Sequence, residues 1–280
     1  MPAAGIADGI AIVAGRGDLP RLIAEDCARR GVPYRVVLLG GLTLDWAASH
    51  PVIAARFEKP GRLFADLRAA GCRQVTFAGG IVRPKLRPFG FDLAMLRLAP
   101  RVIRGLAAGD DSTLRMVAGI FEAEGFRVRA PHEILTDLLA PAGVLGRVAP
   151  AEADRRDAAR AAAIVAALGS VDVGQAAVVA GGICLGLESI QGTDAMLDFV
   201  ARTAAPVRPA GARGVLFKAA KPGQDRRMDL PAVGPGTVEG AARAGLAGVA
   251  VEAGGVMILN LGATVAAADA AGLFLWAREG

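Results

Sequence analysis

The sequence has few of the residues on which several classes of functional site depend. Only 5% of its 280 residues are aromatic, which leaves little for a surface that stacks nucleic-acid bases. Its two histidines, His50 and His132, cannot build a histidine-rich metal centre. The three cysteines are scattered and lack the spacing of a metal-binding pair, so we expect buried thiols in a reducing compartment at Cys27, Cys72 and Cys184.

Signals for secretion, membrane insertion and nucleic-acid binding are also missing. The chain starts Met-Pro-Ala-Ala-Gly-Ile-Ala-Asp, without the basic residues of a secretory signal. Residues 255–277 are apolar but too interrupted for a membrane span, the interruptions being Asn260, Gly262, Asp269 and Gly272. No long run of basic residues occurs. We therefore expect a soluble, cytoplasmic protein with no nucleic-acid partner.

What the sequence has in abundance is material for a packed core. Hydrophobic residues make up 53% of the chain and charged residues 21%, and the dominance of Ala, Val, Leu and Gly is typical of packed helices and buried parallel strands. The net charge of +5 suits an anionic substrate or a negatively charged membrane surface. Ordinary background composition explains that charge equally well.

Strand and helix patterns alternate through the first half. Short apolar runs predict strands at 10–14, 34–39, 74–78 and 126–129. Helical spacing of apolar residues predicts helices at 19–30, 63–70, 92–107 and 112–124. This alternation favours right-handed crossovers and a Rossmann-like, doubly wound parallel sheet over residues 1–130.

The pattern restarts after a segment rich in proline and glycine, which we interpret as a linker over residues 131–150. Residues 151–280 are expected to form a C-terminal α/β domain whose topology the pattern leaves open. Its predicted helices are 151–168, 193–202, 237–246 and 263–279. Its predicted strands are 175–180, 183–187, 214–218, 247–251 and 256–261, with a polar loop at 221–235.

Two glycine-containing turns follow predicted strands of the first half. The first, Gly15-Arg16-Gly17-Asp18-Leu19-Pro20, opens a helix, where backbone N–H groups and the helix dipole can hold an anion. Pro20 stands where a dinucleotide fingerprint has its third glycine, and Asp18 would repel a phosphate, so a plain tight turn is the alternative.

The second turn, residues 79–84, lies at the carboxyl end of a strand, where open α/β sheets bind ligands. Its glycines permit close approach of a ligand, and Arg83 can address a phosphate. A flexible crossover with a solvated arginine is the alternative.

Further along, Asp110 and Asp111 place two carboxylates at a helix start, as a functional pair or as ordinary caps.

The densest polar segments lie in the second half. Glu188, Asp194 and Asp225 offer hard oxygen ligands of the kind that Mg²⁺ or Mn²⁺ prefers. Such an ion would orient a pyrophosphate, and nearby lysine or arginine side chains would stabilise the charge that develops on it. A solvated loop is the alternative interpretation. Taken alone, these segments indicate only an α/β protein that binds a phosphorylated ligand.

Together, the segments resemble one known family. They are Gly15 through Pro20, Gly80 through Pro84, Gly109 through Arg115, Glu188 through Asp194, Lys221-Pro222-Gly223-Gln224-Asp225-Arg226-Arg227 and Gly245 through Gly254. In this order they are similar to the UDP-2,3-diacylglucosamine pyrophosphatases of lipid A biosynthesis that are unrelated to calcineurin-like phosphoesterases. The resemblance extends over essentially the full length.

The resemblance implies Mg²⁺-dependent hydrolysis to UMP and 2,3-diacylglucosamine 1-phosphate, two domains with the substrate between them, and an active-site aspartate at Asp225. Expected partners are the acylated UDP-sugar, the acylated sugar 1-phosphate and, transiently, the inner-membrane surface; a homodimer is left open. The candidate catalytic residues are Asp225, Lys218, Lys221, Gln224 and Arg226. The candidate substrate-binding residues are Gly15, Arg16, Gly17, Gly79, Gly80, Ile81, Arg83, Asp111, Arg115, Gln191 and Thr193. The candidate metal ligands are Asp225, Asp194 and Glu188.

Two other functional classes stay open from the residues alone. A nicotinamide-dependent oxidoreductase could use the same doubly wound half, although the glycine fingerprint is incomplete. A non-catalytic nucleotide-sugar sensor would bind the ligand without turnover, and the acidic residues near Asp225 would then lack a purpose. The fold by itself does not separate these classes, because one fold hosts many functions.

Overall fold

The chain divides into two compact units in the computed structural model, which describes residues 8–80, 88–107, 110–139 and 141–279. Unit 1 comprises residues 1–135 together with 227–229, and unit 2 comprises 136–226 and 230–280. The division after Leu135 falls inside the segment that we expected as a linker. The sequence analysis did not predict that residues 227–229 belong to unit 1. Met228 is buried in the core of that unit, and Arg227 forms an ion pair of 2.7 Å with Glu122.

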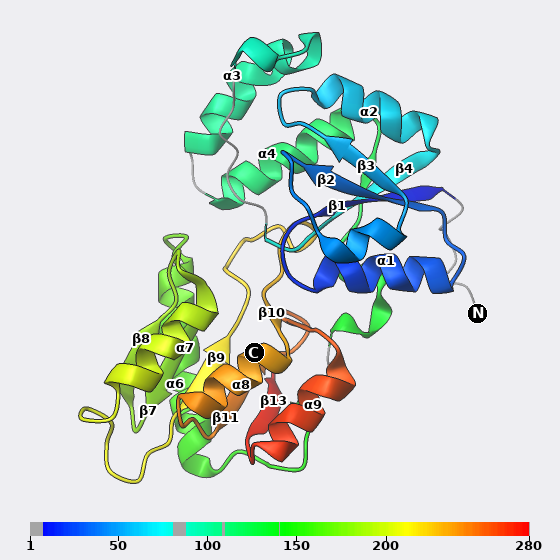
Figure 1. The fold of residues 1–280 in the computed structure, drawn as a ribbon. Helices are drawn as coiled ribbons and strands as arrows, with labels where there is room; N and C mark the ends of the chain where they lie inside the picture. Colours follow the sequence, from blue (N-terminus) through cyan, green and yellow to red (C-terminus); the bar gives the residue numbers. More distant parts are fainter. Residues whose placement is uncertain (1–7, 81–87, 108–109, 140, 280) are drawn as a thin grey trace. The chain divides into compact units, whose positions relative to one another are not determined.

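Unit 1 is built on a single sheet (Figure 1). Its strands are β1 (Gly9–Ala14), β2 (Tyr34–Leu39), β3 (Val52–Ala55), β4 (Cys72–Ala78) and β5 (Arg127–Val128). Its helices are α1 (Leu19–Arg29), α2 (Pro60–Ala69), α3 (Leu93–Ala107), α4 (Asp110–Ala123) and α5 (Pro131–Ile134), with 3-10 turns η1 (Asp45–Ser49) and η2 (Pro88–Gly90).

All five strands of this sheet run parallel, in the order β3-β2-β1-β4-β5. The central strand β1 is buried along its whole length, as its unbroken apolar run requires. Side chains of α2 and α4 pack on one face, where Phe64 and Phe121 meet at 5.2 Å between ring centroids. Helix α1 covers the other face (Figure 1). The prediction of a doubly wound parallel sheet is confirmed.

Strand β3 was missed by the sequence analysis. It lies at the sheet edge, and its side chains alternate between exposed and half-buried positions. The segment therefore lacks the apolar run by which the interior strands were recognised. Its position is given by pairing with β2, in which Val36 lies opposite Val52.

Unit 2 contains a second, mixed sheet. Its strands are β6 (Gly143–Val144), β7 (Ala176–Ala180), β8 (Ile183–Leu187), β9 (Val215–Lys218), β11 (Gly248–Glu252) and β13 (Phe274–Arg278), and a separate pair is formed by β10 (Ala232–Val233) and β12 (Met257–Ile258). Its helices are α6 (Glu152–Gly169), α7 (Gly192–Thr203), α8 (Pro235–Arg243) and α9 (Leu261–Ala270), with the 3-10 turn η3 (Thr136–Leu138).

The order of the larger sheet is β6-β13-β11-β9-β7-β8. Strands β9, β11 and β13 are parallel to one another, whereas β7 is antiparallel to both of its neighbours. Alternate residues of the buried strands point to opposite faces. As a result, Val178 and Leu216 pack with α7, α8 and α9, while Val179 and Phe217 pack with α6.

The prediction of a helix over 263–279 is wrong. Helix α9 ends at Ala270, and Gly272 takes a positive φ of 64°, a left-handed conformation that ends the helix. The chain then forms β13, in which Phe274 lies opposite Gly248 of β11. The apolar residues of this segment fit a helix or a strand, and its pairing with the central strand β11 makes it a strand.

Two of the three cysteines are buried as expected, and the third is not. Cys27 and Cys72 are inaccessible, whereas Cys184 is exposed because its strand β8 forms the sheet edge. Among the described residues, none of the helices has both the length and the apolar character that crossing a bilayer requires.

Candidate active site

Charged residues of unit 2 gather at the carboxyl-terminal ends of its parallel strands. Lys218, the last residue of β9, lies opposite Val251 of β11 on one side and Ala176 of β7 on the other. The backbone N–H of Glu188, just after β8, donates to the carbonyl of Ala176. Glu188, Lys218 and Glu252 therefore lie at the carboxyl-terminal ends of β8, β9 and β11. Open α/β sheets bind ligands at this end of their strands.

Lys218 is a buried cation with a defined set of partners. Its Nζ donates to Thr193 Oγ1 at 2.7 Å, and the same hydroxyl donates to Glu188 Oε2 at 2.7 Å. The distance from Lys218 Nζ to Glu188 Oε2 is 3.9 Å. Because Lys218 and Thr193 are less than a tenth exposed, the hydroxyl links two charges that would otherwise face each other across poorly solvated space.

The loop after β9, residues 219–226, carries Asp225 and is held by Glu252. Glu252 Oε2 accepts a hydrogen bond from the backbone N–H of Ala220 at 3.1 Å, and Oε1 lies 3.3 Å from an Arg226 guanidinium nitrogen. The carboxylate turns back over Gly255, where a Cβ atom would lie 2.2 Å from Glu252 Oε2. One carboxylate thus binds both ends of the loop.

The middle of this loop is fixed by two further contacts. Gln224 Oε1 accepts from Gln175 Nε2 at 3.1 Å and from the backbone N–H of Lys221 at 3.0 Å. Lys221 Nζ forms an ion pair of 2.7 Å with Asp172. Asp225, which follows Gln224 directly, is half-buried. Its backbone is therefore anchored on both sides.

In unit 1 the two glycine turns are hydrogen-bonded to each other. The N–H of Gly15 donates to Ala78 O at 2.7 Å, and Arg16 and Gly80 exchange backbone hydrogen bonds of 2.9 and 3.0 Å. A Cβ at Gly79 would lie 2.3 Å from Arg16 O, and one at Gly15 2.6 Å from Gly79 O. The glycines allow two backbones to touch at the point between β1 and β4 where the strand order reverses, a usual ligand position.

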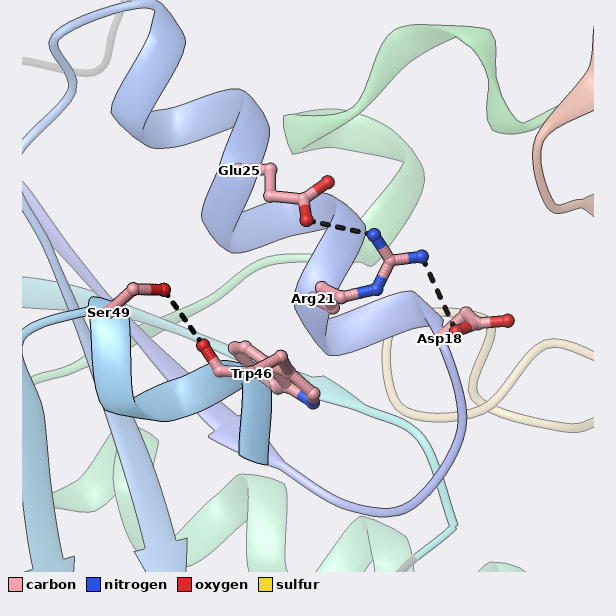
Figure 2. A network of polar contacts seen from close by, with 5 residues as sticks. All are labelled: Asp18, Arg21, Glu25, Trp46 and Ser49. Carbon is pink, nitrogen blue, oxygen red and sulfur yellow. Dashed lines mark hydrogen bonds and ion pairs between the residues drawn. The ribbon is translucent and has the colours of Figure 1, made fainter. Parts of the chain in front are cut away.

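Helix α1 begins directly after the first of these turns. Asp18 occupies the N-cap position without making a side-chain cap, and its carboxylate contacts Arg21, which also donates to Glu25 at 2.8 Å (Figure 2). The hydrogen bond to Glu25 is the main reason why the pKa of the Arg21 guanidinium is raised. Arg21 offsets the charge of Asp18, which reduces the expected repulsion of a phosphate. Arg16 is exposed beside it.

Comparison with known proteins assigns the chain to a family over nearly its whole length. Residues 9–138 match the family model of the LpxI N-terminal domain, and residues 141–276 match that of the LpxI C-terminal domain. This chain belongs to the LpxI family. It is 38% identical over 268 residues to the UDP-2,3-diacylglucosamine pyrophosphatase LpxI of Caulobacter vibrioides, an alignment that covers 95% of this chain and 96% of that protein.

In this LpxI-family chain, each of the cations that we expected to act on a phosphate lies beside a carboxylate. Lys218 lies near Glu188, Lys221 binds Asp172, and Arg226 binds Glu252. Lys221 and Arg226 therefore fix the loop that carries Asp225. Their carboxylate partners Asp172 and Glu252, and the Gln175 amide, were missed. A local signal for Glu252 is its place directly after an apolar run and three residues before Gly255, whose missing Cβ leaves room for the carboxylate.

The predicted metal ligands are not gathered into one cluster. Among the residues that the structure describes, no group of three or more His, Cys, Asp or Glu side chains could hold a metal ion. Glu188 is bonded to Thr193, and Asp194 is exposed in the first turn of α7, where a carboxylate favours the helix dipole. Mg²⁺ commonly uses one or two carboxylates together with substrate phosphates, and this arrangement of residues fits only that kind of site.

Three of the remaining predicted residues lie on helices or at their starts. Gln191 is exposed at the start of α7, and Arg115 is exposed on α4. Asp111 lies in the first turn of α4. Ile81 and Arg83 lie outside the described residues.

Proposed function

We propose that this chain hydrolyses the pyrophosphate of UDP-2,3-diacylglucosamine, releasing UMP and 2,3-diacylglucosamine 1-phosphate. The proposal is supported by the full-length similarity to the Caulobacter vibrioides pyrophosphatase. The structural observation that carries it is the loop with Asp225, anchored at the carboxyl edge of β9 and β11. A half-buried carboxylate on a fixed backbone can be held against a reacting phosphate.

In this hydrolysis, water adds its oxygen to one phosphorus, and the bridging P–O bond breaks, so that the bridging oxygen leaves with the other phosphate. A base must accept a proton from the water. We assign this role, or the binding of Mg²⁺, to Asp225. Glu252 and Gln224 are positioning residues, because they bind the backbone and the ends of the loop.

Positive charge at this edge comes first from Lys218, whose ammonium group is oriented by Thr193. A preoriented cation in a poorly solvated site stabilises the negative charge of a pyrophosphate more than a solvated one does. Mg²⁺, when bound, would neutralise charge on the phosphate oxygens. In unit 1, we assign nucleotide phosphate recognition to exposed Arg16 and to the uncapped start of α1.

The test is UMP release from UDP-2,3-diacylglucosamine dispersed in detergent, with Mg²⁺, with Mn²⁺ and with EDTA. We expect metal-dependent release by the wild-type protein. Asp225→Asn should lower kcat by about 10²–10⁴-fold with little change in KM, the loss typical of a missing base. The matched control is Asp198→Asn, an exposed carboxylate on α7, which should keep wild-type kinetics.

Three outcomes would contradict parts of the proposal. No UMP release with intact, dispersed substrate would reject the pyrophosphatase function and favour a nucleotide-sugar sensor. Release that EDTA does not reduce would reject Mg²⁺. Near-normal activity of Asp225→Asn would remove Asp225 from the reaction.

The acyl chains of this substrate lead to a proposal about location. A diacylated sugar partitions into a bilayer, so the enzyme would meet it at a membrane surface. We therefore propose that the protein acts in the cytoplasm, at the inner face of the inner membrane.

A further inference from the structure

Helix α3 carries a stripe of apolar side chains that are exposed in the part of the chain that the structure describes. Leu93, Leu96 and Ile103 are 74%, 57% and 65% exposed, and Phe89 in the preceding turn is fully exposed. Pro100 is exposed between them. The spacing of residues 93, 96, 100 and 103 places them on one side of the helix. Single exposed apolar residues are ordinary, but a stripe of this length marks an interaction surface.

The opposite side of α3 is firmly attached to unit 1. Met95 is buried, and Leu98 and Val102 pack against the core. Asp92 accepts hydrogen bonds from the backbone N–H groups of Met95 at the start of α3 and of Gly61 in α2. These contacts fix which side of the helix faces outward, so the exposed stripe is a property of the folded unit.

Three arginines flank the stripe on one side. Arg97, Arg101 and Arg104 are exposed and follow the helix at spacings of four and three residues, which places them next to the apolar residues. In the described part of the chain, none of the three forms an ion pair with a carboxylate. The exposed surface of α3 therefore combines leucine, isoleucine and phenylalanine with cationic groups, the combination found in helices that lie in a membrane interface.

We propose that α3, together with Phe89, docks on a bilayer that contains anionic phospholipid. The apolar side chains enter the boundary between headgroups and acyl chains, and Arg97 and Arg104 contact the headgroup phosphates. Charge complementarity favours this partner over a second copy of the chain, because anionic headgroups attract Arg97, Arg101 and Arg104, whereas the same surface of a second copy carries the same positive charge. The purpose of docking rests on the proposed function, since it would bring the enzyme to an acylated substrate, but the binding itself does not.

Cosedimentation of the full chain with vesicles tests the proposal without substrate. We expect binding to vesicles containing phosphatidylglycerol, much weaker binding to phosphatidylcholine alone, and a loss of binding with added salt. Leu93→Gln combined with Ile103→Gln should weaken binding by about tenfold or more. Arg97→Gln combined with Arg104→Gln should weaken it about 25-fold, at about fivefold for each arginine.

Matched controls lie away from α3. Val207→Gln changes a residue of unit 2 that is 63% exposed, and Arg73→Gln changes an exposed arginine of β4. Both should bind vesicles as the wild-type protein does. All four changed residues of α3 are exposed, so circular dichroism and melting should be unaltered in those variants.

Activity measurements separate this proposal from the proposed function. The α3 variants should keep wild-type turnover of detergent-dispersed substrate and lose turnover of substrate embedded in anionic vesicles. If the wild-type protein is inactive in both assays yet binds vesicles through α3, only the proposed function fails. If the wild-type protein does not bind anionic vesicles, or if the α3 variants bind equally well, the docking proposal fails. It also fails if Leu93→Gln with Ile103→Gln turns a dimer into a monomer without affecting vesicle binding.

Discussion

Replacing Thr193 by valine tests the polar centre of unit 2 with almost no change in shape. The substitution removes two hydrogen bonds of 2.7 Å, one from Lys218 and one to Glu188. Hydrogen bonds to charged groups contribute about 1.5–3 kcal/mol each. Part of this loss is recovered, because Lys218 Nζ is only 3.9 Å from Glu188 Oε2 and a direct pair can form. We expect a net destabilisation of about 2–3 kcal/mol, which for a domain of this size lowers Tm by about 6–10 °C.

The two tryptophans allow unit 2 to be followed alone, because Trp46 lies in unit 1 and Trp276 in β13. Urea and thermal unfolding are measured by fluorescence in a Trp46→Phe background. Thr193→Ser keeps the hydroxyl and should stay within about 1 kcal/mol of the parent. Thr203→Val on the same helix removes only a bond to the carbonyl of Phe199 and should cost no more than about 0.5 kcal/mol. If Thr193→Val unfolds like Thr203→Val, the hydroxyl does not link Lys218 to Glu188 in the way described.

Two further predictions concern unit 1. Gly79→Ala should destabilise it by about 2 kcal/mol or more, because a Cβ would lie 2.3 Å from Arg16 O at a φ of +82°. Gly80→Ala, whose Cβ meets nothing within 4 Å, should stay within about 0.5 kcal/mol of the wild-type stability. Equal urea midpoints for the two variants would argue against the contact between the turns. Burial raises the pKa of the Cys27 thiol to about 11, so the folded chain keeps a proton that the unfolded chain loses near its ordinary value of about 8.5. Stability should therefore fall by about 2–3 kcal/mol as pH rises from about 9 to 11, and Cys27→Ala should remove that part of the slope; parallel pH profiles of the two proteins would contradict the assigned cause.

Several parts of the fold could be predicted because a local pattern determines them. The apolar runs of β1, β2 and β4 predicted buried strands, and the glycines after β1 and β4 predicted turns. The candidate loop around Asp225 was found in the same way, as a polar segment inside an apolar domain. Its residues are neighbours in sequence, so no knowledge of the sheet was needed to group them.

Other parts depend on contacts between distant segments. Glu252 was overlooked because its role requires β11 to lie beside β9, which places its carboxylate against Ala220 and Arg226. The pairing of Lys221 with Asp172 likewise joins residues far apart in the chain. Segment 274–278 has apolar residues that suit a helix or a strand, and only pairing with β11 selects the strand.

By itself, the amino-acid sequence determined the α/β class, the parallel sheet of unit 1 and the family resemblance, because hydrophobic period and short motifs are local properties of the chain. Tertiary structure alone decided which charges are neighbours. It placed a carboxylate beside each of three expected phosphate-binding cations, Lys218, Lys221 and Arg226, and it set the outward face of α3 through the burial of Met95. The physical reason is that a charge or an apolar side chain acquires its role from the solvent and partners around it, and these are fixed only when separate elements pack.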